Sequence, residues 1–150
     1  MQTEIHLYRS VRIDNFPDGT VINDKPAPEI LHPDFEPRIL PSGKARKADV
    51  VLSGDKQWVF AKGGTSLFDK KNVFKSKSWL SFDIPGGTQI PESLVVRFTG
   101  HNPVFEANHY QIESRAERMR VDAYKAALDN LARNAVVRAI ALSNEKHASR

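Results

Sequence analysis

The chain has 150 residues, enough for one domain that buries roughly 70% of the surface of its unfolded chain without help from disulfides or a metal. It contains no cysteine, which excludes disulfides, thiolate metal sites and a cysteine nucleophile. The 22 basic and 18 acidic residues give a mild net charge of +4. No apolar run approaches the ~18 residues of a membrane span and the N-terminus lacks the pattern of a signal peptide, so we expect a cytoplasmic protein with no membrane contact.

The first expected element is a strand over residues 5–12. Ile5, Leu7 and Val11 alternate with mostly polar residues, and Arg9 falls on their apolar face. A guanidinium on a buried face costs free energy unless it meets an anion or lines a ligand cleft. Arg9 is therefore a candidate ligand-binding residue, although an internal salt bridge or a partly buried face explains its position equally well.

Residues 16–47 are interrupted by prolines and glycines, which excludes regular helices and central strands there. We expect a long ordered loop, or a wrap around the core. Leu31 and Phe35 are its expected anchors into the core. His32 could touch a ligand, but a histidine before a proline is more often structural.

The next segment, residues 62–70, reads Lys-Gly-Gly-Thr-Ser-Leu-Phe-Asp-Lys and interrupts an apolar run. A Gly-Gly pair lets the backbone take positive φ and approach a ligand closely. The hydroxyls of Thr65 and Ser66 and the nearby amides can donate hydrogen bonds to phosphate, ribose or carboxamide oxygens. We therefore predict a ligand-binding turn, with an ordinary turn capped by Thr or Ser as the alternative.

Short strands separated by turn residues are expected over residues 50–52, 57–61, 79–84, 94–98 and 109–113. Together they indicate a largely antiparallel sheet core. Ser114 and Glu117 fit a capping box, which predicts a long helix from about Ala116 to Ser143. Spacings of three and four give this helix one apolar face, made of Val121, Tyr124, Leu128, Leu131, Ala135, Ala139 and Leu142.

Positive charge is concentrated between Pro41 and Ser78, where nine Lys or Arg residues face three Asp residues. Residues 69–77 are the densest part of this region. Such a basic patch can attract a dinucleotide or a nucleic acid, and a solvated, solubilising loop is the alternative.

Three features in order resemble the signature of NAD-dependent ADP-ribosyltransferases: an inward arginine, a Gly-Gly-Thr-Ser stretch and a late His-Tyr strand. The chain resembles more closely the ADP-ribosyltransferase-like toxins exported by bacterial type VI secretion, the family of the exported effector "two". The matching stretches run in family order over residues 7–11, 31–35, 63–69, 82–91, 109–110 and 128–135. The resemblance implies a single α+β domain over residues 1–150, with two small, mostly antiparallel sheets around a cleft and a long C-terminal helix.

The resemblance also implies a cytotoxic, NAD-dependent enzyme. Such a toxin would be delivered into a target cell, modify an unknown macromolecule with NAD or hydrolyse NAD, and be neutralised in its producer by a cognate immunity protein. An alternative is a toxin of the same fold that binds nucleic acid or protein through its basic region, without NAD chemistry. A third hypothesis is a nuclease in which His101 and His109 form an acid–base pair; no metal site is expected.

The resemblance places Arg9 at the family's first-strand arginine, Thr65 and Ser66 at the central hydroxyl pair, and His109 in the third motif. Cleaving the nicotinamide–ribose bond develops positive charge on the ribose, so the enzyme must hold the pyrophosphate and place acceptors near the sugar. The candidate NAD-binding residues are Arg9, Gly64, Thr65, Ser66, Phe68, Tyr110 and Gln111, and the candidate catalytic residues are Thr65, Ser66, His109 and Glu113.

Glu113 is a candidate because well-studied ADP-ribosyltransferases usually end their signature with a glutamate that grips a ribose hydroxyl, as a glycosidase carboxylate does. Strand alternation places Glu113 on one face with His109 and Gln111. Gln111 could serve as a weaker ribose ligand. The alternative role for Glu113 is to place negative charge before the N-terminus of the following helix.

Overall fold

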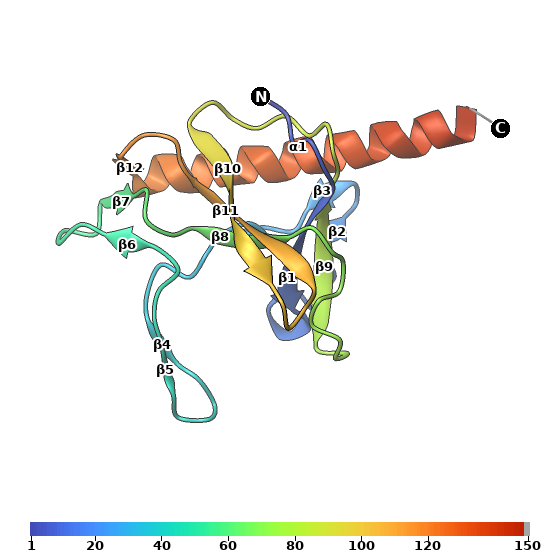
Figure 1. The fold of residues 1–150 in the computed structure, drawn as a ribbon. Coiled ribbons are helices and arrows are strands. Elements are labelled where there is room, and N and C mark those ends of the chain that lie inside the picture. The colour runs from blue at the N-terminus through green and yellow to red at the C-terminus, as the bar shows by residue number, and fades with distance from the viewer. Residues whose placement is uncertain (149–150) are drawn as a thin grey trace.

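The computed structural model describes residues 1–148, in which a long helix crosses one face of a five-stranded antiparallel sheet (Figure 1). The strand order of this main sheet is β10-β11-β8-β1-β9. Its strands are β1 (Leu7–Arg12), β8 (Thr65–Phe68), β9 (Trp79–Ile84), β10 (Leu94–Asn102) and β11 (Ala107–Ser114). The expected combination of short antiparallel strands with a long C-terminal helix is confirmed.

Smaller ladders surround the main sheet. A three-stranded sheet has the order β12-β7-β6, the proline-rich segment contributes two hairpins, and a 3-10 turn precedes that segment. The hairpin β4–β5 extends away from the body (Figure 1). The bounds are η1 (Ile13–Asn15), β2 (Val21–Ile22), β3 (Lys25–Pro26), β4 (Arg38–Ile39), β5 (Ala45–Arg46), β6 (Val51–Leu52), β7 (Trp58–Phe60) and β12 (Arg118–Arg120).

Strand β8 corrects the prediction of a ligand-binding turn over residues 62–70, because residues 65–68 form the central strand of the main sheet. Strand β8 pairs with β11 from Thr65 to Phe68. With β1, however, it shares one register pair, Tyr8 with Phe68. Beyond this pair the two strands diverge, which leaves a fork between residues 9–12 of β1 and residues 65–67 of β8.

Helix α1 (Val121–Ala148) begins later than the capping box predicted. Residues 118–120 instead form β12, which pairs with β7, and the guanidinium of Arg118 lies 4.4 Å from the ring centroid of Trp58. The Ser114 hydroxyl donates to the carbonyl of Ala116 at 2.8 Å rather than to a helical amide. Pairing with an existing strand edge therefore overrides the local helix signal.

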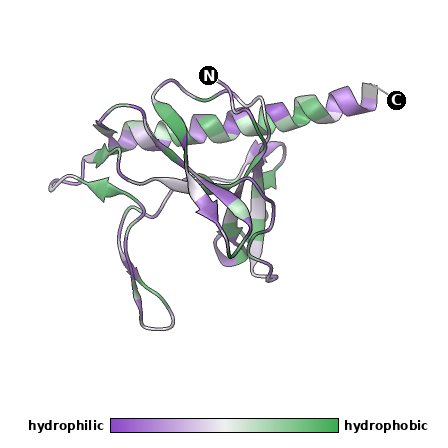
Figure 2. Cartoon of the chain, viewed as in Figure 1, coloured by the Kyte–Doolittle hydropathy of each residue, from purple (hydrophilic) through white to green (hydrophobic). Residues whose placement is uncertain are grey.

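The core lies between α1 and the main sheet. Tyr124, Leu128, Leu131 and Ala135 of α1 are each at most 1% exposed, as the predicted apolar face requires. Ala139 is exposed, because the helix continues past the sheet (Figure 1), and hydrophobic and hydrophilic bands alternate along it (Figure 2). No helix in residues 1–148 has the length and apolarity needed to cross a membrane.

The proline-rich segment is anchored as predicted. Leu31 is fully buried in the core, and Phe35 packs against it. Strand β1 is shorter than predicted, because Ile5 is exposed and precedes the strand. The anchored segment runs beside the fork between β1 and β8, so its residues form one wall of the site described next.

Candidate functional site

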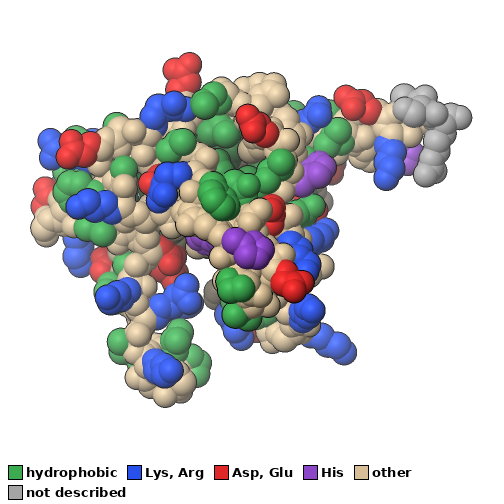
Figure 3. Space-filling view, viewed as in Figure 1, with side chains coloured by type: hydrophobic (Ala, Val, Ile, Leu, Met, Phe, Trp, Pro, Cys, Tyr) green, Lys and Arg blue, Asp and Glu red, His purple; other side chains and the backbone are tan. Residues whose placement is uncertain are grey.

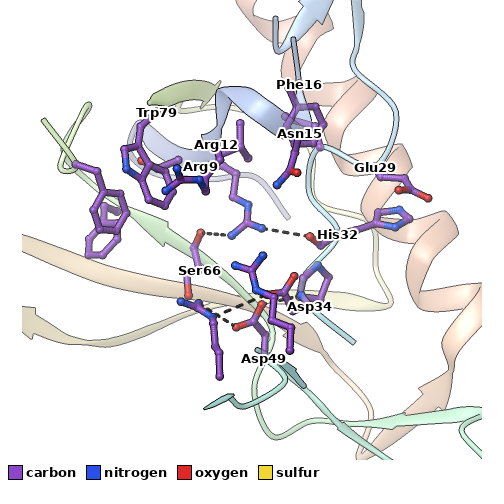
Figure 4. A pocket seen from close by; sticks show the side chains of 18 of the residues that line it. Arg9, Arg12, Asn15, Phe16, Glu29, His32, Asp34, Asp49, Ser66 and Trp79 are labelled. Atoms are coloured by element: carbon purple, nitrogen blue, oxygen red, sulfur yellow. Dashed lines mark hydrogen bonds and ion pairs between the residues drawn. The ribbon is translucent and has the colours of Figure 1, made fainter. Parts of the chain in front are cut away.

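A pocket of about 580 Å³, here called the fork pocket, opens where β1 and β8 diverge (Figure 4). Strands β1 and β8 supply one side, and the segment from Pro28 to Asp34 supplies another. Its volume lies within the range of ligand-binding pockets. Four of the predicted site residues line it, and these are Arg9, Ser66, Phe68 and His109.

Arg9 lies at the centre of the fork, and its predicted inward orientation is confirmed. Its Nη1 donates to the carbonyl of Ser66 at 3.4 Å, and its Nη2 donates to the carbonyl of His32 at 3.2 Å. Its Nε is buried and has no hydrogen-bond partner within residues 1–148. Burial lowers the pKa of Arg9, and the charges of Asp49 and Asp34 oppose this shift. The fork pocket thus contains a half-buried guanidinium whose Nε–H has no acceptor within residues 1–148.

Asp34 and Asp49 form the wall opposite Arg9 and bind the cations of the β4–β5 hairpin. Arg38 Nε lies 3.4 Å from an Asp34 oxygen, and Arg46 Nη2 lies 3.7 Å from an Asp49 oxygen. The backbone amide of Asp34 donates to the Asp49 carboxylate, and the backbone amide of Asp49 donates to the Asp34 carbonyl. Sequence reasoning missed this network, because its members come from two ends of an irregular segment and share no periodic spacing.

Aromatic side chains form the remaining wall. Phe74 and Trp79 are stacked with ring centroids 4.3 Å apart and an interplanar angle of 23°. The guanidinium of Arg12 lies over the Trp79 ring at 5.3 Å from its centroid. Phe68 contacts Phe74 edge to face. Phe74 and Trp79 were not predicted as site residues, and their only sequence signal was an aromatic pair beside the densest run of lysines.

His109 contacts Phe68 edge to face, with centroids 5.1 Å apart, and its Nδ1 hydrogen-bonds the hydroxyl of Thr99. Burial lowers the pKa of His109 from its ordinary value, which favours the neutral imidazole at pH 7. His101 pairs with Asn108, the neighbour of His109 on β11, and so lies on the other face of the sheet. The two histidines do not form the pair that the nuclease hypothesis requires.

Gly64 and Thr65 serve the protein's own backbone. A Cβ at Gly64 would lie 1.9 Å from the carbonyl oxygen of Ile112, so the glycine permits the close approach of two protein segments. Thr65 is fully buried, and its hydroxyl donates to the carbonyl of Leu31 at 2.5 Å. Neither residue is among those lining the fork pocket.

Tyr110, Gln111 and Glu113 also lie outside the lining of the fork pocket. Tyr110 borders a different cavity of about 280 Å³, formed with residues 1–5. Glu113 is 5% exposed and accepts hydrogen bonds from Arg97 Nε at 2.7 Å and from Gln111 Nε2 at 3.0 Å. Its carboxylate is therefore already neutralised by an arginine of β10.

Comparison with known proteins covers most of the chain. A family model described as "Tse2 ADP-ribosyltransferase toxin" matches residues 4–140. The chain belongs to this family. Toxin Tse2 of Pseudomonas aeruginosa is 33% identical over 146 residues, which cover 91% of this chain and 91% of that protein. The family inferred from the ordered motifs is confirmed, and with it the assignment of a cytotoxic ADP-ribosyltransferase effector.

Membership of the Tse2 ADP-ribosyltransferase toxin family implies NAD as a substrate. The family does not favour the alternative of a toxin without NAD chemistry. Within residues 1–148, no group of three or more His, Cys, Asp or Glu side chains is placed to hold a metal ion. The chemical groups that meet in the fork pocket are arginines, the carboxylates of Asp34 and Asp49, a serine, a histidine whose pKa burial lowers, and aromatic rings.

Proposed function

We propose that this Tse2-family toxin binds NAD in the fork pocket and breaks the nicotinamide–ribose bond there, transferring ADP-ribose to an intracellular macromolecule. The observation that carries the proposal is the Arg9 guanidinium, whose buried Nε has no partner within residues 1–148. A buried N–H without an acceptor is costly, and a phosphate or ribose oxygen would satisfy it with a charge-assisted hydrogen bond. NAD supplies both kinds of oxygen.

The other lining groups fit the two ends of NAD. Arg12 adds positive charge to the pocket wall near Arg9, which suits a pyrophosphate, while Arg38 and Arg46 line the pocket paired with Asp34 and Asp49. Phe68 presents an aromatic edge beside His109, where a nicotinamide ring can pack. The hydroxyl of Ser66 lies on the pocket wall next to Arg9 and can orient the nicotinamide carboxamide or the ribose.

The chemistry asked of these residues is mainly electrostatic. When the bond from ribose C1′ to the pyridinium nitrogen breaks, its electron pair leaves with neutral nicotinamide and positive charge develops on the ribose ring. Arg9 holds the phosphates, and the neutral His109 can accept a hydrogen bond from a ribose hydroxyl without adding positive charge beside the sugar. Water or a macromolecule then attacks C1′ and releases a proton.

The remaining predicted site residues receive narrower roles in this proposal. Thr65 positions the pocket wall through its bond to Leu31, and Gly64 lets β8 enter the sheet. Tyr110, Gln111 and Glu113 do not contact NAD. Glu113 instead holds Arg97 at 2.7 Å and so stabilises the pairing of β10 with β11.

We also propose that residues 1–150 act as one toxin domain in the cytoplasm of the target cell, and that a cognate immunity protein neutralises it in the producer. The name of the relative, Toxin Tse2, supports this proposal, because a producer must survive its own toxin. Coexpression with the neighbouring gene product should restore growth, and failure of every neighbour to do so would contradict it.

The test is nicotinamide release from NAD, together with transfer of label from adenylate-tagged NAD into a cell lysate. Arg9→Lys keeps the charge but loses the fork geometry, so we expect activity to fall about 100-fold or more. Ser66→Ala should lower it about tenfold. Arg133→Lys on the exposed face of α1 is the matched control and should be unchanged. Wild-type activity in Arg9→Lys, or cell killing by a wild type that consumes no NAD, would reject the proposal.

A further inference from the structure

Two basic segments border the fork pocket. The basic hairpin, residues 38–47, and the basic loop, residues 70–77, contain no acidic residue. All of their charged side chains are exposed. The cations of the hairpin are Arg38, Lys44, Arg46 and Lys47, and those of the loop are Lys70, Lys71, Lys75 and Lys77.

The two segments reach the same opening. Arg38 and Arg46 of the basic hairpin line the fork pocket, and so do Phe74 of the basic loop and the adjacent Trp79. In the space-filling view, Lys and Arg side chains gather on two projections with a hollow between them (Figure 3). The hairpin β4–β5 forms the projection at the lower left. A chain of negative charges could therefore contact both segments while crossing the pocket mouth.

Most of this charge is not compensated within the protein. Arg38 and Arg46 pair with Asp34 and Asp49, and Lys71 pairs with Asp83 at 3.1 Å. No ion pair within residues 1–148 involves the remaining lysines, which are Lys44, Lys47, Lys70, Lys75 and Lys77. Like charges gathered without partners repel one another, which a polyanionic partner would relieve.

We infer that the macromolecule modified by this toxin is a nucleic acid, bound across the basic hairpin and the basic loop with a base against the Phe74–Trp79 pair. This inference rests on the proposed function. Exposed lysines suit a phosphate backbone, and the half-buried Phe74 and Trp79 rings that line the pocket offer aromatic surface to an unpaired base. An acidic protein would satisfy the lysines but not the stacked aromatic pair at the pocket mouth.

The transfer step balances without another reactant. The bond between ribose C1′ and the nicotinamide nitrogen breaks, and its electron pair leaves with nicotinamide. A hydroxyl oxygen or a base nitrogen of the nucleic acid forms the new bond to C1′. The attacking group gives its proton to solvent, so the products are ADP-ribosylated nucleic acid, nicotinamide and a proton.

Binding is measured by fluorescence anisotropy with a single-stranded RNA and a single-stranded DNA of equal sequence. Lys44→Ala/Lys47→Ala and Lys75→Ala/Lys77→Ala should each weaken binding about tenfold or more. Each should also reduce the slope of log K against log salt by about 1.4, because one phosphate contact contributes about 0.7 on a single strand. Lys25→Ala/Lys146→Ala removes two exposed lysines elsewhere and should bind like the wild type. The inference would be overturned if the Lys44→Ala/Lys47→Ala and Lys75→Ala/Lys77→Ala variants both bound nucleic acid as tightly as the wild type.

The transfer assay separates this inference from the proposed function. Label from tagged NAD that survives protease and is removed by ribonuclease or by deoxyribonuclease supports a nucleic-acid target and tells RNA from DNA. Label found only in protein overturns the inference while leaving the NAD chemistry intact. If neither label transfer nor nicotinamide release occurs, the proposed function fails, and the anisotropy measurement still decides whether the basic segments bind nucleic acid.

Discussion

Thr65 and Ser66 are neighbours in one motif, but the structure gives them different roles. The Thr65 hydroxyl is fully buried and donates to the Leu31 carbonyl, 34 residues away. Thr65→Val keeps the shape but leaves that carbonyl unsatisfied, which should cost about 2 kcal/mol of unfolding free energy. For a chain of this length the melting temperature should fall by roughly 4–8 °C. The Ser66 hydroxyl makes no hydrogen bond within residues 1–148, so Ser66→Ala should stay within about 0.5 kcal/mol of the wild type.

The assay combines thermal unfolding by circular dichroism with nicotinamide release well below both melting temperatures. We expect Thr65→Val to unfold earlier and keep most of its NAD cleavage, and Ser66→Ala to keep its melting temperature and lose about tenfold in kcat/KM. Thr20→Val is the matched control, since its hydroxyl also donates to a carbonyl, that of Ser81 at 3.0 Å, outside the fork pocket. A Thr65→Val variant with wild-type stability and no activity would refute the reasoning.

Three further predictions concern Gly64, His109 and the contact between His32 and Asp129. Gly64→Ala places a Cβ against the Ile112 carbonyl, so we expect the free energy of unfolding to fall by about 3 kcal/mol or more. Urea unfolding measures this change, and a wild-type free energy of unfolding would contradict the close approach of the two segments. Burial lowers the pKa of His109, so its contribution to stability is complete above pH 6.5 and is lost as pH falls through the folded pKa. Imidazole titration by NMR should give a pKa below 6.5, and a higher value would exclude this environment. The His32 ring hydrogen-bonds Asp129 at 2.8 Å, and the backbone carbonyl of His32 accepts a hydrogen bond from Arg9. Asp129→Ala should therefore raise KM for NAD up to about fivefold with little change in kcat. An effect on kcat alone would argue against a positioning role for Asp129.

Sequence periodicity correctly predicted the orientation of residues that lie in regular strands. Alternation put Arg9 on the inward face of β1, and β9 has the bounds that its alternating pattern predicted. The anchors Leu31 and Phe35 followed from apolar residues in a segment that prolines keep irregular. In each case the determining interaction is local, or is the burial of one apolar face.

Tertiary contacts decided the features that the sequence did not predict. Thr65 looked like a ligand-binding residue because a hydroxyl after two glycines is a local signal, but its partner is a distant carbonyl. The capping box at Ser114 was overridden when residues 118–120 paired with β7. The Asp34–Asp49 wall depends on how the proline-rich segment folds back, which no spacing encodes.

The long sequence separations between residues in and beside the fork pocket also have a kinetic consequence. Arg9 reaches the carbonyl of Ser66 across 57 positions, and His32 reaches Asp129 across 97. Contacts of this kind form after large chain loops have closed, so high contact order makes the active arrangement a late product of folding. We therefore expect a newly synthesised or unfolded chain to be harmless, and its toxicity to begin only when the whole sheet has assembled.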